Sequence, residues 1–301
     1  MIENNWIALS LLASVFQVLR NSYSKSLKKS FSDSTITAIR FIFGFPFIII
    51  IFFILNKFSL NFNWLTQKSL LFVSSGSLFQ ILGTFFILRC FQFKNFATGV
   101  TFSKLEAVFA ALISSIFFVD PVKKEGFYFI FLAFIGIIFL FSDSIKHFSL
   151  KNKHQLKCSI YGLICGICFA TSSVLFRHAN ISLITIDSTI LRGINTLFIS
   201  ITLQTIIMIV YLITSNRKAI IKQNKSTFIK STAVGFFGIG ASCCWFIAFG
   251  LANAAYVKTV GQIEILFSII ITVAIFKEKI KINEFIAILI TIFSILGLTY
   301  I

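Results

Sequence analysis

Charged residues are scarce in this chain of 301 residues. They make up only 12% of the sequence, whereas 57% of the residues are hydrophobic and the mean hydropathy is +0.94. A typical soluble domain has roughly a quarter of its residues charged. The shortage of charge therefore excludes a mainly soluble protein, and it predicts an integral membrane protein that is solvated chiefly by lipid.

Sequence motifs for catalysis and metal binding are also lacking. The HExxH, GxSxG and P-loop patterns do not occur, and the three histidines, His147, His154 and His178, lie in or near expected loops. Cys165 and Cys168 form a CxxC motif, but they lie in an apolar run with no second pair and no nearby histidine. We therefore expect neither an enzyme nor a bound metal or cofactor.

Acidic residues are few: ten, against 27 basic residues, which gives a net charge of +17. The basic residues lie mostly in short stretches between apolar runs, where lysine and arginine meet lipid headgroups. No basic motif or stacking platform accompanies them, so we expect no nucleic-acid partner. Most of these basic residues fall on one side of the expected membrane. The positive-inside rule then places both termini outside.

Apolar runs bounded by polar clusters predict an all-α protein with ten membrane-spanning helices. Each run is about 20 residues long, the length that crosses a bilayer. No stretch is left over for a soluble domain. The expected helices are residues 5–25, 34–56, 69–92, 96–119, 126–145, 157–178, 187–213, 229–250, 254–276 and 283–301.

The two halves of the chain resemble one another. We expect residues 1–146 and 157–301 to form two five-helix repeats, joined by a polar linker at 147–156. An offset of 158 positions aligns Glu106 with Glu264, whereas earlier parts of the halves align at an offset of 152. Because five is an odd number, the two repeats must be inverted relative to one another, as in alternating-access carriers.

Two glutamates, Glu106 and Glu264, are centred in apolar stretches. An ionisable side chain at that depth is costly and usually faces a wet cavity. We interpret both as cavity carboxylates that bind a cationic group or take up a coupling ion. The alternative is a structural ion pair with Lys104, Arg20 or Lys258. A direct pair between Lys104 and Glu106 is disfavoured, since residues two apart project to nearly opposite sides of a helix.

Further polar residues are candidates for the same cavity. Arg20 follows an apolar run and begins the polar later part of the first helix, which suits a cavity wall. Lys104 is too central to reach the headgroups. Lys258 is nearer a helix end, and either snorkels to the headgroups or faces the cavity. Side chains expected to offer hydrogen bonds or stacking to a substrate are Gln80, Thr84, Trp245, Tyr256 and Gln262.

Residues 105–122, LEAVFAALISSIFFVDPV, resemble the signature of EamA-type transporters in the drug/metabolite transporter superfamily. That signature reads Leu-Glu-Pro-Val-Phe-Ala-Ala-Leu, then an apolar run and a carboxylate at the helix end. Residues 263–280 look like a second copy. Arg40 and Arg192 match an arginine often found in the family's second and seventh helices. The resemblance covers essentially the whole chain and implies a multi-pass secondary transporter.

The chain departs from this family pattern at one position in each copy. The proline that usually follows the glutamate is replaced by Ala107 in the first copy and by Ile265 in the second. Without proline the helix keeps its backbone hydrogen bond and loses an expected kink. We therefore expect any hinge in these two helices to lie elsewhere, for instance at Gly99 or Gly261.

These features together predict a secondary transporter of the inner membrane. It would move a small polar organic metabolite by alternating access. Three basic candidates against two glutamates favour an amino-acid-like, zwitterionic or anionic substrate. The alternative is a lipid-headgroup flippase of the same fold. The expected partners are the substrate, membrane lipids and, as coupling ion, protons or sodium. A monomer and a homodimer are both compatible with the sequence.

Overall fold

The computed structural model describes residues 5–58, 62–93, 96–118, 120–140, 153–215, 223–267, 282–298 and 300. Within these ranges the regular structure is α-helical, without β-strands. The helices of the first half are α1 (Asn5–Leu27), α2 (Asp33–Ile42), α3 (Phe45–Leu55), α4 (Gln67–Cys90), α5 (Phe96–Ser103), α6 (Glu106–Phe117) and α7 (Lys124–Leu140). Those of the second half are α9 (Lys153–Ile181), α10 (Thr189–Thr214), α11 (Lys225–Leu251), α12 (Ala254–Gly261) and α14 (Ile282–Leu298). The predicted linker up to residue 152, and the second signature from residue 268 onward, lie outside the described residues.

The polar clusters between the apolar runs also start the helices. Thr66 and Ser69 form a capping box at α4, in which each side chain bonds the other residue's backbone amide at 3.1 Å. At α11 the Asn224 side chain accepts from the amide of Thr227 at 2.8 Å. Such caps satisfy backbone donors that the first turn of a helix leaves without partners. The ends of the helices are therefore set locally, before any tertiary packing.

Six helical segments of the described chain are long and apolar enough to cross a membrane. They are Asp33–Leu55, Gln67–Cys90, Gly99–Phe117, Lys153–Ile181, Thr189–Thr214 and Lys225–Leu251. These six do not by themselves establish the predicted count of ten. The predicted helix 254–276 lies partly outside the described residues, because these end at residue 267 and begin again at residue 282.

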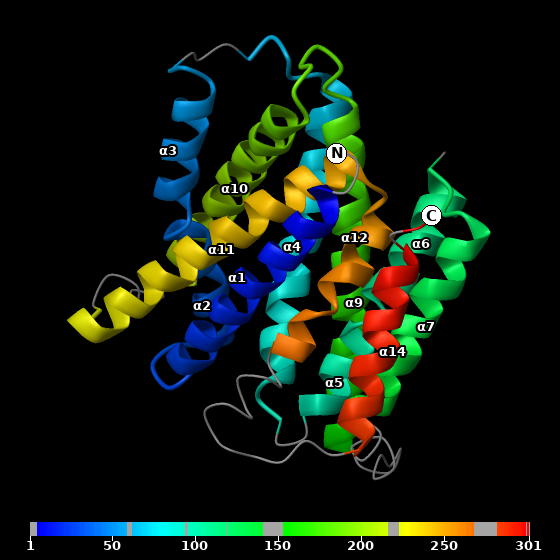
Figure 1. Cartoon of the computed structure of the whole chain (residues 1–301). Helices are drawn as coiled ribbons and strands as arrows, with labels where there is room; N and C mark the ends of the chain where they lie inside the picture. The colour runs from blue at the N-terminus through cyan, green and yellow to red at the C-terminus, as the bar shows by residue number, and fades with distance from the viewer. Residues whose placement is uncertain are drawn as a thin grey trace.

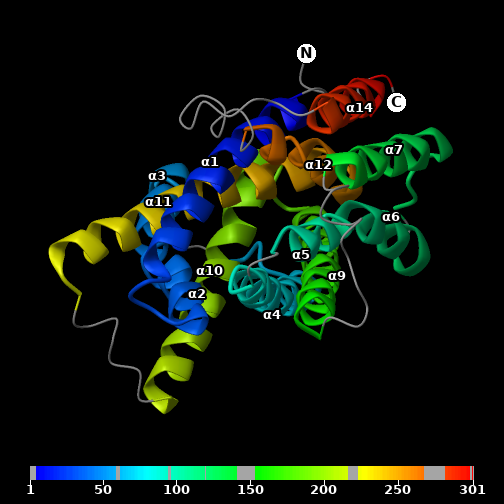
Figure 2. The same cartoon turned by 90° about the horizontal axis from the view of Figure 1, so that it is seen from below.

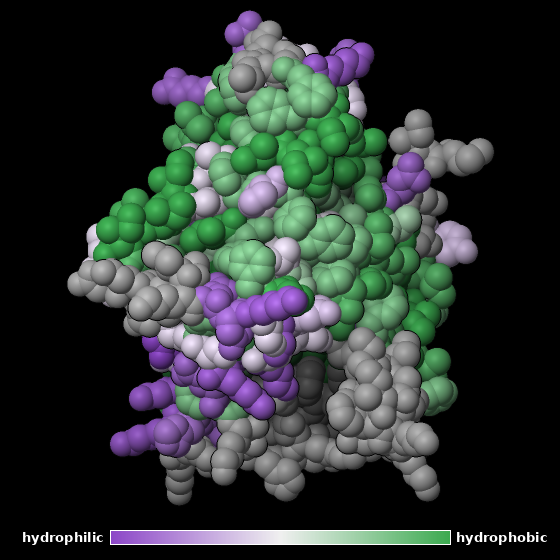
Figure 3. Space-filling view, turned by 90° about the vertical axis from the view of Figure 1, so that its left-hand side faces the viewer, coloured by the Kyte–Doolittle hydropathy of each residue, from purple (hydrophilic) through white to green (hydrophobic). Residues whose placement is uncertain are grey.

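Large apolar side chains cover much of the surface. Ile116 and Phe117 at the end of α6 are 69% and 75% exposed, and Ile213 of α10 is 70% exposed. Figure 3 shows hydrophobic side chains over the middle and upper part of one face, with hydrophilic side chains gathered at its lower end. Such a surface is stable in lipid and not in water. The protein is therefore a multi-pass membrane protein.

The core forms between the two halves of the chain. Helix α1 packs along α11, α4 along α9, and α7 along α14. Each of these pairs joins a helix of the first half to one of the second, and Figures 1 and 2 show the partners side by side. Neither half therefore has a separate core of its own.

The predicted helix at 34–56 is divided into α2 and α3, which corrects the expectation of one continuous helix. Phe43 and Gly44 separate the two, and Pro46 is the second residue of α3. Proline has no N–H to donate and fits only the first turn of a helix. One of the two prolines of the chain thus restarts the helix after the break.

Helices α5 and α9 approach each other backbone to backbone. A Cβ added to Gly162 of α9 would stand 2.0 Å from the carbonyl oxygen of Gly99 in α5. Only glycine permits such an approach, which is common where membrane helices pack closely. This contact fixes the position of α5, and with it the chain segment that leads to Glu106.

We predict that Gly162→Val destabilises the folded protein by at least about 1–3 kcal/mol, because the added side chain must push α5 away from α9. The thermal midpoint of the purified protein in detergent measures this loss. Gly238→Ala is the matched control, since a Cβ there would find its nearest neighbours at 3.6 and 3.7 Å, in ordinary contact. Equal midpoints for the two variants would contradict the packing described here.

Candidate functional site

Two helices are interrupted directly before the two predicted glutamates. Helix α5 ends at Ser103 and α6 begins at Glu106. Helix α12 ends at Gly261, and helical structure resumes at Glu264. Each glutamate thus stands at the first turn of a helical segment, where the helix dipole favours a negative charge.

At the first interruption the helical hydrogen bonds tighten. The amide of Leu105 donates to the carbonyl three residues earlier, at 3.2 Å, instead of four residues earlier. The carbonyl of Lys104 accepts instead from the side-chain amide of Gln262, at 3.3 Å. Gln262, which we predicted to bind substrate, therefore stabilises the break in the other half of the chain.

The second interruption follows the same pattern. The amide of Ile265 donates to the carbonyl three residues earlier, at 3.1 Å, and the carbonyl of Gly261 accepts from the hydroxyl of Ser14, at 3.2 Å. The absence of proline thus does not keep either helix continuous: both are interrupted just before the glutamate, and side chains bond the released carbonyls. Of the two expected hinges, Gly261 adjoins a break and Gly99 lies inside α5.

The two glutamates form crossed ion pairs between the halves. Lys104 of the first half pairs with Glu264 of the second. Lys258 of the second half pairs with Glu106 of the first, with Nζ 3.3 Å from Oε2. All four residues are buried. Each glutamate is thus neutralised by a lysine of the other half, and the direct pair of Lys104 with Glu106 is absent from the ion pairs of the described residues, as predicted.

Aromatic and amide side chains complete this arrangement. Gln17 of α1 donates to Glu264, and its carbonyl oxygen accepts from the indole N–H of Trp245 at 3.2 Å. The ammonium of Lys258 lies 5.1 Å from the centre of the Trp245 ring and 5.6 Å from that of Phe169. Cation–π contacts of this kind stabilise a desolvated ammonium. Trp245 therefore contacts both ion pairs, one directly and one through Gln17.

Arg20, three residues after Gln17 on α1, lies beside the charged cluster, and Arg40 lies with it against Gly238 of α11. Arg20 donates through Nη2 to the side-chain oxygen of Asn21 at 2.8 Å. Arg40 donates through Nη1 to the hydroxyl of Thr84 at 2.5 Å. Arg192, which matches the same family position as Arg40, instead donates to the backbone carbonyl six residues before it. Only one of the two arginines therefore lies at the site.

Tyr256 lies outside the cluster, and its role as a site residue stays a prediction. Its hydroxyl accepts from the backbone amide of Lys123, at 3.1 Å, where α7 begins. Tyr256 precedes Lys258 by two residues and therefore projects from nearly the opposite face of α12. Gln80 contacts Gln204 of α10, whose side-chain amide donates to it at 2.6 Å.

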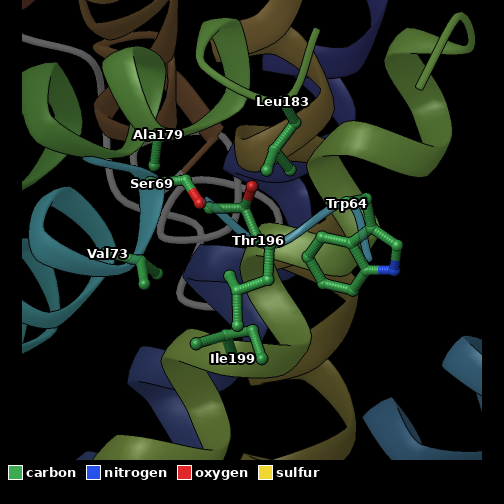
Figure 4. Close-up of a pocket in the computed structure, with 8 residues that line it drawn as sticks. Trp64, Ser69, Val73, Ala179, Leu183, Thr196 and Ile199 are labelled. Carbon is green, nitrogen blue, oxygen red and sulfur yellow. The ribbon is translucent and has the colours of Figure 1, made fainter. Parts of the chain in front are cut away.

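One small hollow lies away from the charged cluster (Figure 4). It is formed by the α3–α4 connection together with α4, α9 and α10, and its lining is uncharged. The lining residues are Trp64, Leu65, Ser69, Val73, Ala179, Leu183, Thr196 and Ile199. It offers two hydroxyl groups and no ionisable group. We therefore assign no binding role to it.

Gln17 was not predicted from the sequence as a site residue, and Arg40 was predicted only as a match to a family arginine. Ser10, Ser14 and Gln17 are spaced by four and then three residues, which puts them on one face of a helix. This polar stripe, continued by Arg20, is a sequence signal for the side of α1 that faces the ion pairs. Arg40 has no comparable signal, because its neighbours in the site come from other helices.

The comparisons with known proteins agree with this architecture. The chain matches the EamA-like transporter family twice, over residues 4–142 and 156–300. A solved crystal structure superposes with a TM-score of 0.73, covering 99% of this chain and 97% of that one at 14% sequence identity, which shows a shared fold. A comparison with curated proteins finds no match. The chain belongs to the EamA-like transporter family, within the drug/metabolite transporter superfamily.

Proposed function

We propose that this protein is a secondary transporter. It carries a small polar organic metabolite, zwitterionic or anionic, across the inner membrane by alternating access. The crossed pairing of Lys104 with Glu264 and of Lys258 with Glu106 is the observation that supports this most directly. These pairs lie between the two halves of the molecule, which is where a carrier binds its substrate.

The ion pairs give a physical route from substrate binding to movement. A buried charge is costly unless it is paired, and in the crossed pairs of the empty site each lysine is neutralised by a glutamate. A carboxylate of the substrate can replace Glu264 on Lys104, and an ammonium group, a proton or a sodium ion can replace Lys258 on Glu106. Each ion pair joins opposite halves of the molecule. Replacing one partner by a substrate group therefore changes the relative stability of two conformations that differ in how the halves are packed.

Equivalent contacts at opposite ends of the molecule support two repeats that are inverted relative to one another. Lys28, after α1, donates to the carbonyl of Leu88 at 2.5 Å. Asn180, at the end of α9, donates to the carbonyl of Phe246 at 2.7 Å. The donors are 152 positions apart and the acceptors 158, the two offsets seen in the sequence. Helix α1 runs downward in Figure 1 and α9 upward, so the two contacts lie at opposite ends.

An ion pair between the halves closes one end of the bundle. Arg177 of α9 bonds Asp120, after α6, at 2.5 and 3.2 Å. The same guanidinium donates to the carbonyls of Phe249 and Ala252 at the end of α11, at 2.9 and 2.6 Å. Opening a path to the crossed ion pairs from this end requires this contact to separate. It is therefore our candidate for the gate of that side.

The distribution of basic residues supports an orientation. Lys25, Lys28 and Lys29 lie where α1 leads to α2, at the lower end in Figure 1. We propose that this end faces the cytoplasm, with both termini on the other side. The four residues of the crossed pairs come from one chain, so a monomer is sufficient for the site. A homodimer would add nothing to it.

We predict that Glu106→Gln destabilises the protein by about 3–5 kcal/mol, because it leaves the buried ammonium of Lys258 without its partner. Adding Lys258→Gln should restore most of this loss, since no unpaired charge then remains. Thermal unfolding in detergent of the two single variants, the double variant and the unchanged protein measures the coupling. A double variant as unstable as the sum of the single variants would show that the pair does not interact.

We predict that a Glu106→Gln, Glu264→Gln variant loses transport. Purified protein in proteoliposomes is given a pooled metabolite extract under a pH or sodium gradient, and mass spectrometry identifies what accumulates. Glu125→Gln, at an exposed carboxylate of α7, is the matched control and should transport normally. Uptake is normalised to the protein that remains folded.

Three results would each mean something different. A compound that accumulates with the unchanged protein and not with the variant supports the proposal. If the variant still accumulates the compound, both glutamates have a structural role and the protein is still a carrier. No accumulation by the unchanged protein under either gradient contradicts transport of a soluble metabolite. Labelled lipids would then test headgroup flipping.

A further inference from the structure

Two arginines from different helices lie against the same point of α11. Cδ of Arg20 and Cγ of Arg40 lie 3.6 and 3.7 Å from the place where a Cβ on Gly238 would stand. Because Gly238 has no side chain, space is left between the stems of the two arginines.

Both arginines are buried without an acidic partner. Their side chains are 9% and 8% exposed, and neither forms an ion pair with a carboxylate in the described part of the chain. Their hydrogen-bond acceptors are neutral: Asn21 for Arg20, and Thr84 for Arg40. A buried charge is costly unless it is paired. This cost is difficult to explain as a contribution to folding alone.

The two arginines leave the cluster of charged side chains with a net positive charge. The two lysines and two glutamates of the crossed ion pairs cancel. Arg20 and Arg40 add two positive charges. Arg20 is three residues after Gln17, which bonds Glu264, and therefore lies on the same face of α1 as that contact. The arginines and the crossed pairs are thus one electrostatic unit. A ligand with two negative charges would neutralise it, whereas a zwitterion would not.

Several donors of the two guanidinium groups remain available. Each guanidinium has five N–H donors. Arg20 uses Nε and Nη2 on Asn21, and Arg40 uses Nη1 on Thr84. Among the described residues, the fully enclosed polar atoms without a partner include no guanidinium nitrogen of either arginine. The remaining donors are therefore not fully enclosed, and water can reach them.

We propose that Arg20 and Arg40 form an oxyanion subsite beside the crossed ion pairs, and that the transported metabolite carries a doubly charged oxyanion, either a phosphate monoester or a pair of carboxylates. The planar guanidinium matches both groups, since it donates two parallel hydrogen bonds to them. Asn21 and Thr84 hold the two guanidiniums in place. This inference rests on the proposed transport function and narrows its substrate class.

Binding to the purified full-length protein tests the subsite without requiring transport. The probes are glycerol 3-phosphate, inorganic phosphate, succinate and, as a zwitterion, glycine, each at constant ionic strength. The thermal midpoint in detergent is measured for the unchanged protein and for an Arg20→Gln, Arg40→Gln variant. Arg192→Gln, which removes an arginine outside the cluster, is the matched control.

We expect at least one dianion to raise the midpoint of the unchanged protein and of Arg192→Gln in a saturable way. The double variant should not respond. Without ligand its midpoint should equal or exceed that of the unchanged protein, because two unpaired buried charges are gone. Arg40→Lys keeps the charge but loses the fork of donors, and should bind the dianion about tenfold more weakly. Tighter binding of glycerol 3-phosphate or inorganic phosphate would indicate a phosphate substrate, and tighter binding of succinate would indicate a dicarboxylate.

The subsite is overturned if the double variant still responds, if no dianion binds the unchanged protein, or if glycine stabilises it equally. A lower midpoint of the unliganded double variant would make the arginines structural. Transport is read separately in proteoliposomes. Uptake of a metabolite that is not a dianion would contradict the proposed subsite, but it would still support transport. If a dianion binds through the arginines but no metabolite is transported, the proposed transport function is contradicted and the subsite is supported.

Discussion

Charge buried in an apolar medium is the constraint on which the rest of this structure depends. Lys104 and Lys258 are neutralised by glutamates of the opposite half, so neither half can bury its own charges alone. The packing of α12 against α6 and of α1 against α11 follows from this need, because it brings the two pairs and Gln17 together. Around this centre large apolar side chains cover much of the surface of the described helices.

A residue of the second helix break bonds the first break across the same interface. Gln262 stands 158 positions after Lys104, so the two residues occupy corresponding places in the repeats. In the structure they meet, and the side chain of Gln262 donates to the carbonyl of Lys104. A duplicated sequence has thus diverged at one position so that one copy contributes a charge and the other a hydrogen-bond donor. Divergence of this kind makes the site asymmetric although the fold is repeated.

Most of the helices could be predicted from the sequence because apolar runs and their polar boundaries are local signals. The expected helix 187–213 agrees closely with α10 (Thr189–Thr214). The break after α2 was missed although Pro46 marks it. The sequence predicted the two glutamates, the two lysines and Arg20 as site residues, because a charge in an apolar run is conspicuous, but it did not predict Arg40. Their pairing, and the exclusion of Tyr256, depend on how helices of different halves are rotated against each other, and no local pattern records that.

The missing prolines give the two interruptions a property that a proline-broken helix lacks. Ala107 and Ile265 both carry an amide hydrogen, so the chain can form a continuous helix at either place. Donors from outside the broken helices bond the released carbonyls: Gln262, at the end of α12, and Ser14 of α1, whose hydroxyl also bonds the carbonyl of Ser10. If those helices move away, the released carbonyls can be satisfied again by the helix itself. Straight and broken helices are then two states of one sequence, and the choice between them is made by the packing.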